Sequence, residues 1–253
     1  MKVISLNTWG AKAGIDGLLG FCERYRDSVD AFCFQEVWNG GEEFRGKKAA
    51  RFTLEQFDSG MLEKMAEVLP DHQLYYRPHF AGIFGLAAFV RVPSVSEEGR
   101  VDIYKEDGYS SEENIAEHNR IMQFVTLGTP ACTIAHLHGL WSSSGKIDTE
   151  DRLAQSEKVL SFLSALDHPY VLLGDFNLRP ETESLKKLEA AGMRNLVAEH
   201  GIKTTRTSLY DNREREPHAD YAFVSAGIEV KDFQVLPDEV SDHAPLYLEF
   251  DIA

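Results

Sequence analysis

The sequence predicts a single domain of the mixed α/β class in which β-sheets pack together. Strand-like apolar segments outnumber helical ones, and helices separate only some of the strands, which argues against a doubly wound parallel sheet. No Pro/Ser-rich linker, internal repeat or shift in composition divides the 253 residues. We therefore expect one domain over residues 1–253, a length that can enclose a sizeable core.

Apolar patterning places the elements of the first half of the chain. Lys2–Leu6 is expected to form a first strand, and apolar residues then recur at helical spacing from Ile15 to Val29. Ala31–Phe34 has the composition of a buried second strand, and Met61–Leu69 that of an amphipathic helix ended by Pro70. Further strands are expected at Gln73–Arg77, Gly85–Val92, Val101–Lys105, Arg120–Leu127 and Ala131–His138.

The second half of the chain begins with a long helix. Asp148 or Thr149 can cap it, and its acidic first turn suits the helix dipole. Val171–Leu173 has the composition of a buried strand, and a second helix is expected to start at Pro180 and stop at Gly192. Late strands are expected at Ala219–Val224, Val230–Leu236 and Leu246–Phe250, and long loops at Gly40–Gly60, Glu106–Asn119 and Lys203–Pro217.

Charge and cysteine content limit the classes of function. The formal charge of −15, from 41 acidic and 26 basic residues, opposes non-specific binding to duplex nucleic acid or anionic lipid. Cys22, Cys33 and Cys132 lack the spacing of metal ligands. Cys33 and Cys132 lie in apolar strand-like runs, and we expect them to be buried thiols in a reducing compartment. Neither a signal peptide nor an apolar run of membrane-spanning length is visible, so a cytoplasmic protein, monomeric by default, is expected.

Polar residues recur at the ends of the apolar strands. Asp175 and Asn177 follow one strand two positions apart, so on extended backbone their side chains share a face, and oxygen groups there suit a hard cation or a polarised water. The segments with this pattern are Leu6-Asn7-Thr8-Trp9, Phe34-Gln35-Glu36-Val37, Ala135-His136-Leu137-His138-Gly139, Gly174-Asp175-Phe176-Asn177, Ala219-Asp220-Tyr221 and Ser241-Asp242-His243.

Taken together and in this order, these segments resemble the endonuclease/exonuclease/phosphatase superfamily. Gly-Asp-Phe-Asn and Ser-Asp-His are its most characteristic elements, and the resemblance extends over the whole chain. It implies a four-layer α/β sandwich of the deoxyribonuclease I type, with two β-sheets face to face and helices outside. It also implies a metal-dependent hydrolase of phosphoric esters.

The resemblance implies a metal site, and the chemistry agrees with it. It places Mg²⁺, with Mn²⁺ as the alternative ion, at Glu36, with Asn7 and Asp242 beside it. Mg²⁺ usually takes one or two protein carboxylates and completes its shell with water and substrate phosphate.

The resemblance also implies the catalytic residues. Asp175 would orient and deprotonate the attacking water, and Asn177 would help to hold the phosphate. His243 would contact the phosphate or shuttle a proton, with Asp220 fixing its tautomer. His138 fits the strand-end histidine of the family better than His136, because Gly139 follows it. The other histidines, expected at the surface or in structural roles, are His72, His79, His118, His168, His200 and His218.

The chain also departs from the family. Trp9 stands where abasic-site endonucleases carry an additional acidic residue. Trp9, Trp38 and Trp141 each lie within three positions of a motif residue, where they either pack in the core or form an aromatic wall for a base, a sugar or a lipid chain. Arg120 and Arg206 are candidate phosphate contacts, although surface ion pairing is the plainer interpretation of both.

The main functional hypothesis is Mg²⁺-dependent hydrolysis of a phosphodiester by in-line attack of water. The substrate would be a nucleic acid, a nucleotide or a phospholipid headgroup, and the acidic chain favours a small or single-stranded one. The first alternative is a phosphomonoesterase of a sugar or inositol phosphate. A catalytically silent scaffold is a weaker alternative, because such a protein should have lost at least one of the motif residues, and all are present here.

Overall fold

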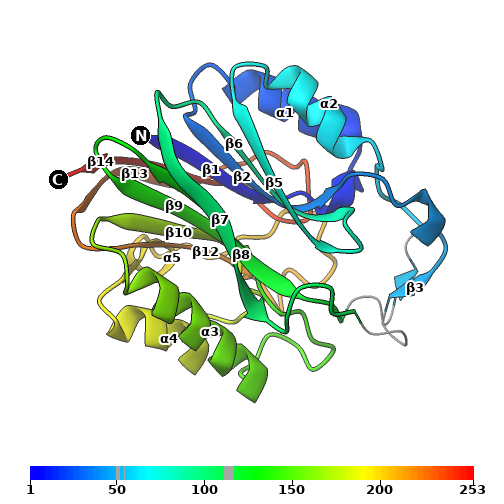
Figure 1. The fold of residues 1–253 in the computed structure, drawn as a ribbon. Coiled ribbons are helices and arrows are strands. Elements are labelled where there is room, and N and C mark those ends of the chain that lie inside the picture. Colours follow the sequence, from blue (N-terminus) through cyan, green and yellow to red (C-terminus); the bar gives the residue numbers. More distant parts are fainter. Residues whose placement is uncertain (50–51, 54, 111–116) are drawn as a thin grey trace.

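Two six-stranded β-sheets pack face to face, with helices on their outer surfaces (Figure 1). The structure, a computed structural model, describes residues 1–49, 52–53, 55–110 and 117–253. The strand orders are β13-β14-β1-β2-β6-β5 and β11-β12-β10-β9-β8-β7. This arrangement confirms the four-layer sandwich.

The first sheet carries α1 (Ile15–Tyr25) and α2 (Met61–Val68) on its outer face. Alternate residues of its strands face opposite layers: Val3 and Cys33 join the apolar cluster shared with the second sheet, whereas Ile4 and Phe32 pack beneath the two helices. Its strands are β1 (Lys2–Asn7), β2 (Ala31–Trp38), β5 (Gln73–Phe80), β6 (Phe84–Val90), β13 (Ile228–Val235) and β14 (Leu246–Ile252).

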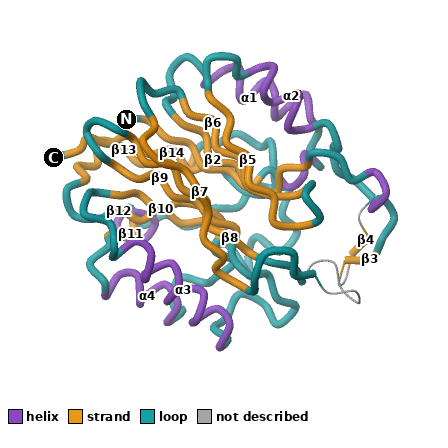
Figure 2. Tube along the Cα trace, viewed as in Figure 1, coloured by secondary structure: helices purple, strands orange, loops and turns teal. Residues whose placement is uncertain are grey.

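The second sheet is covered by α3 (Glu150–Leu163) and α4 (Glu183–Ala190), with the short α5 (Leu196–Glu199) beside them (Figure 2). Its strands are β7 (Val95–Tyr104), β8 (Arg120–Leu127), β9 (Cys132–His138), β10 (Tyr170–Asp175), β11 (Arg194–Asn195) and β12 (Asp220–Val224). A separate two-stranded ribbon, β3 (Lys48–Ala49) and β4 (Phe52–Thr53), projects from the loop after β2.

Most sequence-based elements are confirmed, and the exceptions concern boundaries and the shortest elements. The helix expected from Pro180 begins at Glu183, because Asp148 accepts hydrogen bonds from the backbone N–H groups of Glu183 and Ser184. Asp148 therefore serves α4, while Thr149 caps α3. The helix expected to reach Val29 ends at Tyr25, and β11 and α5 were missed. Parts of the expected loops, at 50–51, 54 and 111–116, lie outside the described residues.

The three cysteines are buried and unpaired, which confirms the expectation of buried thiols for Cys33 and Cys132 and adds Cys22. Burial raises the pKa of each of these thiols, Cys22, Cys33 and Cys132, to about 12. Within the described part of the chain, no helix is both long enough and apolar enough to cross a membrane.

Strand pairing gathers the polar strand ends at one edge of the sandwich. In the first sheet β1 runs parallel to β2, which places Asn7 opposite Gln35, the neighbour of Glu36. In the second sheet β10 runs parallel to β9 and antiparallel to β12, so Asp175 lies opposite both His138 and Asp220. Register alone therefore brings several candidate site residues together.

Strands β9 and β10 approach very closely at Gly174. Its φ of 130° is one that L side chains rarely adopt, and a Cβ atom there would lie 2.2 Å from the carbonyl oxygen of Leu137. Only glycine fits this position without displacing the strand that carries Asp175.

Replacing Gly174 with Ala should lower the free energy of unfolding by roughly 2–5 kcal/mol, because the added methyl group overlaps backbone and the conformation is disfavoured. Urea denaturation measures this change. Gly20→Ala is the matched control: Gly20 lies within α1 and a Cβ there meets nothing within 4 Å. It should raise stability by up to about 1 kcal/mol. Equal stability of the two variants would contradict the prediction.

Candidate active site

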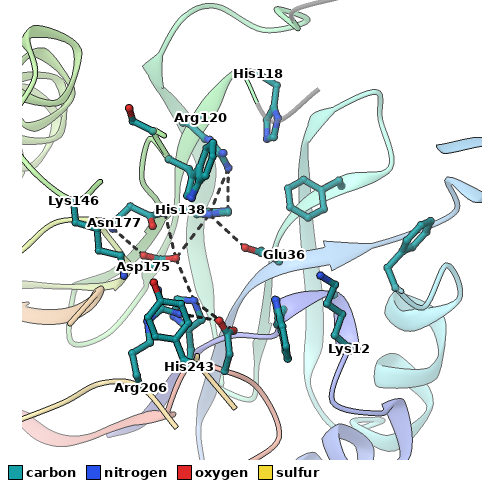
Figure 3. Close-up of a pocket in the computed structure, with 18 of the residues that line it drawn as sticks. Lys12, Glu36, His118, Arg120, His138, Lys146, Asp175, Asn177, Arg206 and His243 are labelled. Carbon is teal, nitrogen blue, oxygen red and sulfur yellow. Dashed lines mark hydrogen bonds and ion pairs between the residues drawn. The ribbon is translucent and has the colours of Figure 1, made fainter. Parts of the chain in front are cut away.

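One pocket, with a cavity of about 360 Å³, brings together the residues that the sequence analysis proposed (Figure 3). The proposed residues that line it are Glu36, His138, Asp175, Asn177, Asp242 and His243. Asn7 and Asp220 lie behind them, each hydrogen-bonded to a lining residue. Side chains from both sheets therefore meet in this pocket. The metal-binding and catalytic roles that the sequence analysis assigned to them stay predictions.

Asn7 links the two carboxylates at the centre of the pocket. Its Nδ2 donates to Glu36 Oε1 and to Asp175 Oδ2, each at 3.0 Å. Glu36 lies where the β2–β6 register shifts, and its φ is 58°, so a β-bulge directs its side chain into the pocket. Burial raises the pKa of Glu36 to about 7; Asn7 opposes this shift, and the negative charges of Asp242 and Asp175 add to it.

Asp175 is held by the turn that follows it. Its Oδ1 accepts the backbone N–H of Asn177 at 2.8 Å, and the Asn177 amide lies 3.4 Å from both Asp175 Oδ2 and the carbonyl oxygen of Gly139. Asn177 itself has a φ of 54°, an uncommon backbone conformation for a residue other than glycine. Both oxygens of Asp175 are therefore oriented before any substrate binds.

His243 and Asp220 form a buried pair. His243 Nδ1 lies 2.9 and 2.8 Å from the two Asp220 oxygens. Burial lowers the pKa of His243 to about 4, and the charge of Arg206 adds to this effect. The imidazole is therefore neutral at pH 7 and donates Nδ1–H to Asp220. Burial raises the pKa of Asp220, whereas Arg206 and Lys146 oppose that shift.

This tautomer leaves His243 Nε2 as an acceptor. It lies 3.7 Å from Asp175 Oδ2 and 3.7 Å from Asp242 Oδ1. Three acceptors that face one another repel, and a cation or the hydrogens of a water molecule would stabilise them.

His138 has the opposite tautomer. Arg120 Nη1 lies 3.1 Å from His138 Nδ1 and 3.5 Å from Nε2. Because a guanidinium can only donate, the shorter contact assigns Nδ1 as the acceptor and the ring proton to Nε2. Burial and the Arg120 charge hold the pKa of His138 well below its usual range. Its Nε2–H faces Glu36 Oε1 at 3.7 Å and Asp175 Oδ2 at 3.9 Å, where it can donate to a bound group.

Arg120 and Arg206 are both buried, and the expectation of surface ion pairs was wrong. Arg206 Nη1 donates to Asp242 Oδ2 at 3.0 Å, and its guanidinium lies 4.0 Å from the centre of the Tyr210 ring. Because both arginines line the pocket, their charges act on the site.

A comparison with protein-family models identifies the chain. The model described as Endonuclease/Exonuclease/phosphatase family matches residues 4–243. The chain belongs to this family. Members hydrolyse phosphoester bonds, and the chain is an enzyme of that class. A comparison with the sequences of functionally curated proteins finds no match.

Solved structures with this family fold cover nearly the whole chain. A mannosyl-6-phosphatase of Bacteroides thetaiotaomicron is 20% identical, with 100% of both chains covered and a TM-score of 0.73. A humanized D. rerio TDP2 is 15% identical, covers 99% of this chain and 98% of its own, and has a TM-score of 0.71. ANGEL2, a 2′,3′-cyclic phosphatase, is 15% identical, covers 98% and 94%, and has a TM-score of 0.63. At these identities the likeness concerns the fold.

Several other side chains line the pocket although they belong to none of the sequence motifs. Lys146 lies in a Ser/Gly-rich loop, and Arg152 lies in the first turn of α3. Arg152 is buried and donates to the carbonyl oxygens of Leu140, Gly145 and Ile147, so it fixes the loop that carries Lys146. Neither position carries a periodicity or spacing signal that the sequence analysis could have used.

Two histidines to which the sequence analysis gave no catalytic role, His118 and His136, differ in their position relative to the pocket. His118, which the sequence analysis assigned to the surface or to a structural role, lines the pocket and stacks on His79 with ring centroids 5.0 Å apart. His136 does not line the pocket; it contacts Gln35 and Gln123 instead. The geometry therefore places His138, and not His136, against the site.

All three tryptophans line the pocket, as an aromatic wall requires. Trp38 stacks on Phe57 with centroids 4.2 Å apart, and with Phe80 and Phe84 it forms a cluster separate from the two main cores. Trp9 lines the same pocket from left-handed backbone, with a φ of 53°. Such strain persists where surrounding contacts hold it, and it is often found at functional sites.

Proposed function

We propose that the protein is a Mg²⁺-dependent phosphodiesterase that hydrolyses a small phosphodiester by direct attack of water, with residues 1–253 acting as one domain. The observation that carries this proposal is the set of Glu36, Asp175 and Asp242 around two buried histidines: His138 Nε2 lies within 4 Å of Glu36 and Asp175, and His243 Nε2 within 4 Å of Asp175 and Asp242. A group of acids with a proton acceptor and a proton donor at fixed positions suits hydrolysis of an anionic ester.

The residues present fit a hard divalent cation. Glu36 supplies the principal carboxylate, with Asn7 and Asp242 beside it. Burial raises the pKa of Glu36, and the charges of Asp242 and Asp175, which a cation would offset, add to the shift. Asp175, Asp220 and His243 also offer ligand atoms within 4.8 Å of one another. We favour Glu36, because His243 Nδ1 and Asp220 already bind each other at 2.8 Å. When bound, the ion would polarise a phosphoryl oxygen.

The chain's own residues supply the proton path. Asp175, oriented by Asn7 and Asn177, accepts the proton of the attacking water. The proton passes to His243 Nε2, 3.7 Å away, and then to the leaving oxygen, while Asp220 stabilises the transient imidazolium. The Asn177 amide and the His138 Nε2–H donate to the phosphate.

The lining supports a small substrate with an apolar or planar alcohol. A cavity of about 360 Å³ suits a small molecule or one unit of a polymer better than duplex nucleic acid. A diester carries one negative charge on its phosphate and a monoester up to two, so the acidic centre favours the diester. Nucleotides, single-stranded nucleic acid and phospholipid headgroups share this chemistry. The buried, unpaired thiols support a cytoplasmic location.

Asp175→Asn and His243→Ala should each lower kcat roughly 10²–10⁴-fold, because each removes a step of the proton path. Hydrolysis of bis-p-nitrophenyl phosphate with Mg²⁺, and with EDTA, measures this loss. Asp27→Asn, whose parent carboxylate is 86% exposed, is the control and should keep full activity. Cleavage of p-nitrophenyl phosphate alone would indicate a sugar- or inositol-phosphatase. Metal-independent activity would overturn the metal assignment.

Mg²⁺ affinity should rise with pH, because the ion must displace the proton from Glu36. The pKa of Glu36 is about 7 in the folded protein, so the carboxyl group is mostly protonated at pH 6 and ionised at pH 8. The apparent affinity should therefore be about tenfold weaker at pH 6 than at pH 8. Calorimetric titration measures it, and Glu36→Gln should bind weakly with no such slope. A flat profile for the unaltered protein would count against Glu36 as a ligand.

Trp9→Ala should raise KM for diesters with an aromatic alcohol several-fold, because the indole lines the pocket beside the aromatic cluster. The KM for methyl esters should change much less, and Trp9→Phe should retain most of the preference. Steady-state kinetics with bis-p-nitrophenyl phosphate and with dimethyl phosphate, a diester without a ring, separates the two effects. Equal changes for both substrates would show that Trp9 shapes the pocket without contacting the alcohol.

A further inference from the structure

A buried chain of hydrogen bonds crosses between the two sheets behind the pocket. Gln35 of β2, His136 of β9 and Gln123 of β8 are almost completely inaccessible to solvent. Gln35 Nε2 lies 3.2 Å from His136 Nδ1, and His136 Nε2 lies 3.0 Å from Gln123 Oε1. Gln123 Nε2 then donates to the carbonyl oxygen of Tyr75 at 2.8 Å, back in the first sheet.

The chemistry of the groups gives this chain one consistent direction. An amide nitrogen only donates, so His136 Nδ1 accepts from Gln35 and the ring proton lies on Nε2. That proton points to the Gln123 oxygen, which accepts it. Each link between these three side chains therefore has one donor and one acceptor. Gln35 Nε2 also lies 3.0 Å from the Cys33 carbonyl oxygen and 3.3 Å from Ser5 Oγ, whereas Gln35 Oε1 accepts no hydrogen bond from the described residues.

Gln35 is also the residue before Glu36, inside the β-bulge. The β2–β6 register shifts between Phe34 and Val37, and Glu36 has a left-handed φ of 58°. From the other side, Thr8 donates its N–H and Oγ1–H to the Gln35 carbonyl at 3.0 and 2.8 Å. A strained conformation of this kind persists only where its neighbours hold it.

We propose that His136, acting through Gln35, is a positioning residue that holds the bulge so that Glu36 points at the metal site. His136 does not line the pocket and touches no reacting atom. This inference rests on the proposed function, since it takes Glu36 as the metal ligand. Outer partners that orient a ligand commonly change metal affinity roughly 10–100-fold when they are removed.

If His136 had a purely structural role, its loss would lower stability without a specific effect on metal affinity. A second buried pair in the same sheet provides the control. Thr126 and Thr133 join β8 to β9 by a hydrogen bond of 2.8 Å, and no contact links them to the bulge. Thr126→Val and His136→Leu both remove a buried hydrogen bond between these strands. Of the two, only His136→Leu removes a side-chain partner of Gln35, whose Nε2 keeps the Cys33 carbonyl oxygen and Ser5 Oγ as acceptors.

The experiment is calorimetric titration of Mn²⁺ and Mg²⁺ into the full-length protein, with thermal unfolding measured alongside. His136→Leu and Gln35→Met should each weaken metal binding roughly 10–100-fold. The double variant should be little worse than either single one, because both act through one bond. Thr126→Val should lower Tm and leave metal affinity unchanged. If His136→Leu does not fold, Gln35→Met tests the same bond from its other end.

The outcomes separate this inference from the proposed function. An unaltered protein that binds neither ion would overturn both. An unaltered protein that binds metal, with folded His136→Leu or Gln35→Met variants that bind it equally well, would overturn only the positioning role. Weakened binding in Thr126→Val to the same degree would likewise assign the effect to general destabilisation.

Discussion

The site depends on two pairs of parallel strands packed across one core. Among the described strand pairs, only β1–β2 and β9–β10 are parallel. Parallel neighbours end at the same edge of a sheet, so each pair delivers its polar residues to one place. Packing the sheets face to face then sets Asn7 and Glu36 against His138 and Asp175, while the antiparallel β12 adds its first residue, Asp220.

Burial and charge together determine the protonation states in this site. Low solvent access favours neutral forms, which holds His138 and His243 uncharged and raises the pKa of Glu36. Arg206 compensates one carboxylate, Asp242, by a direct buried contact. Acidic side chains gathered in one site lower the stability of the folded state. The buried arginines offset part of this loss, and the β-bulge holds the backbone that carries Glu36.

Much of this architecture could be predicted from sequence, because strands and motifs leave local signals. Apolar runs gave the main strands, and the polar residues at their ends predicted which side chains would meet. Arg120 and Arg206 were misplaced because arginine is usually exposed, and only tertiary packing shows that each has a buried partner. Lys146 and His118 lie in or beside loops, whose conformation depends on distant contacts such as those of Arg152. The β-bulge at Glu36 likewise depends on its neighbours.

The pairing of β1 with β14 bears on how the protein is made. Lys2 lies opposite Glu249, and the two termini emerge side by side in Figure 1. Of the strands in the first sheet, the one that carries Asn7 is translated before all the others, yet its neighbour β14 is translated after all of them. The first sheet therefore closes only after β14 has been translated, and until then the edge of β1 that β14 covers is open to pairing with other strands.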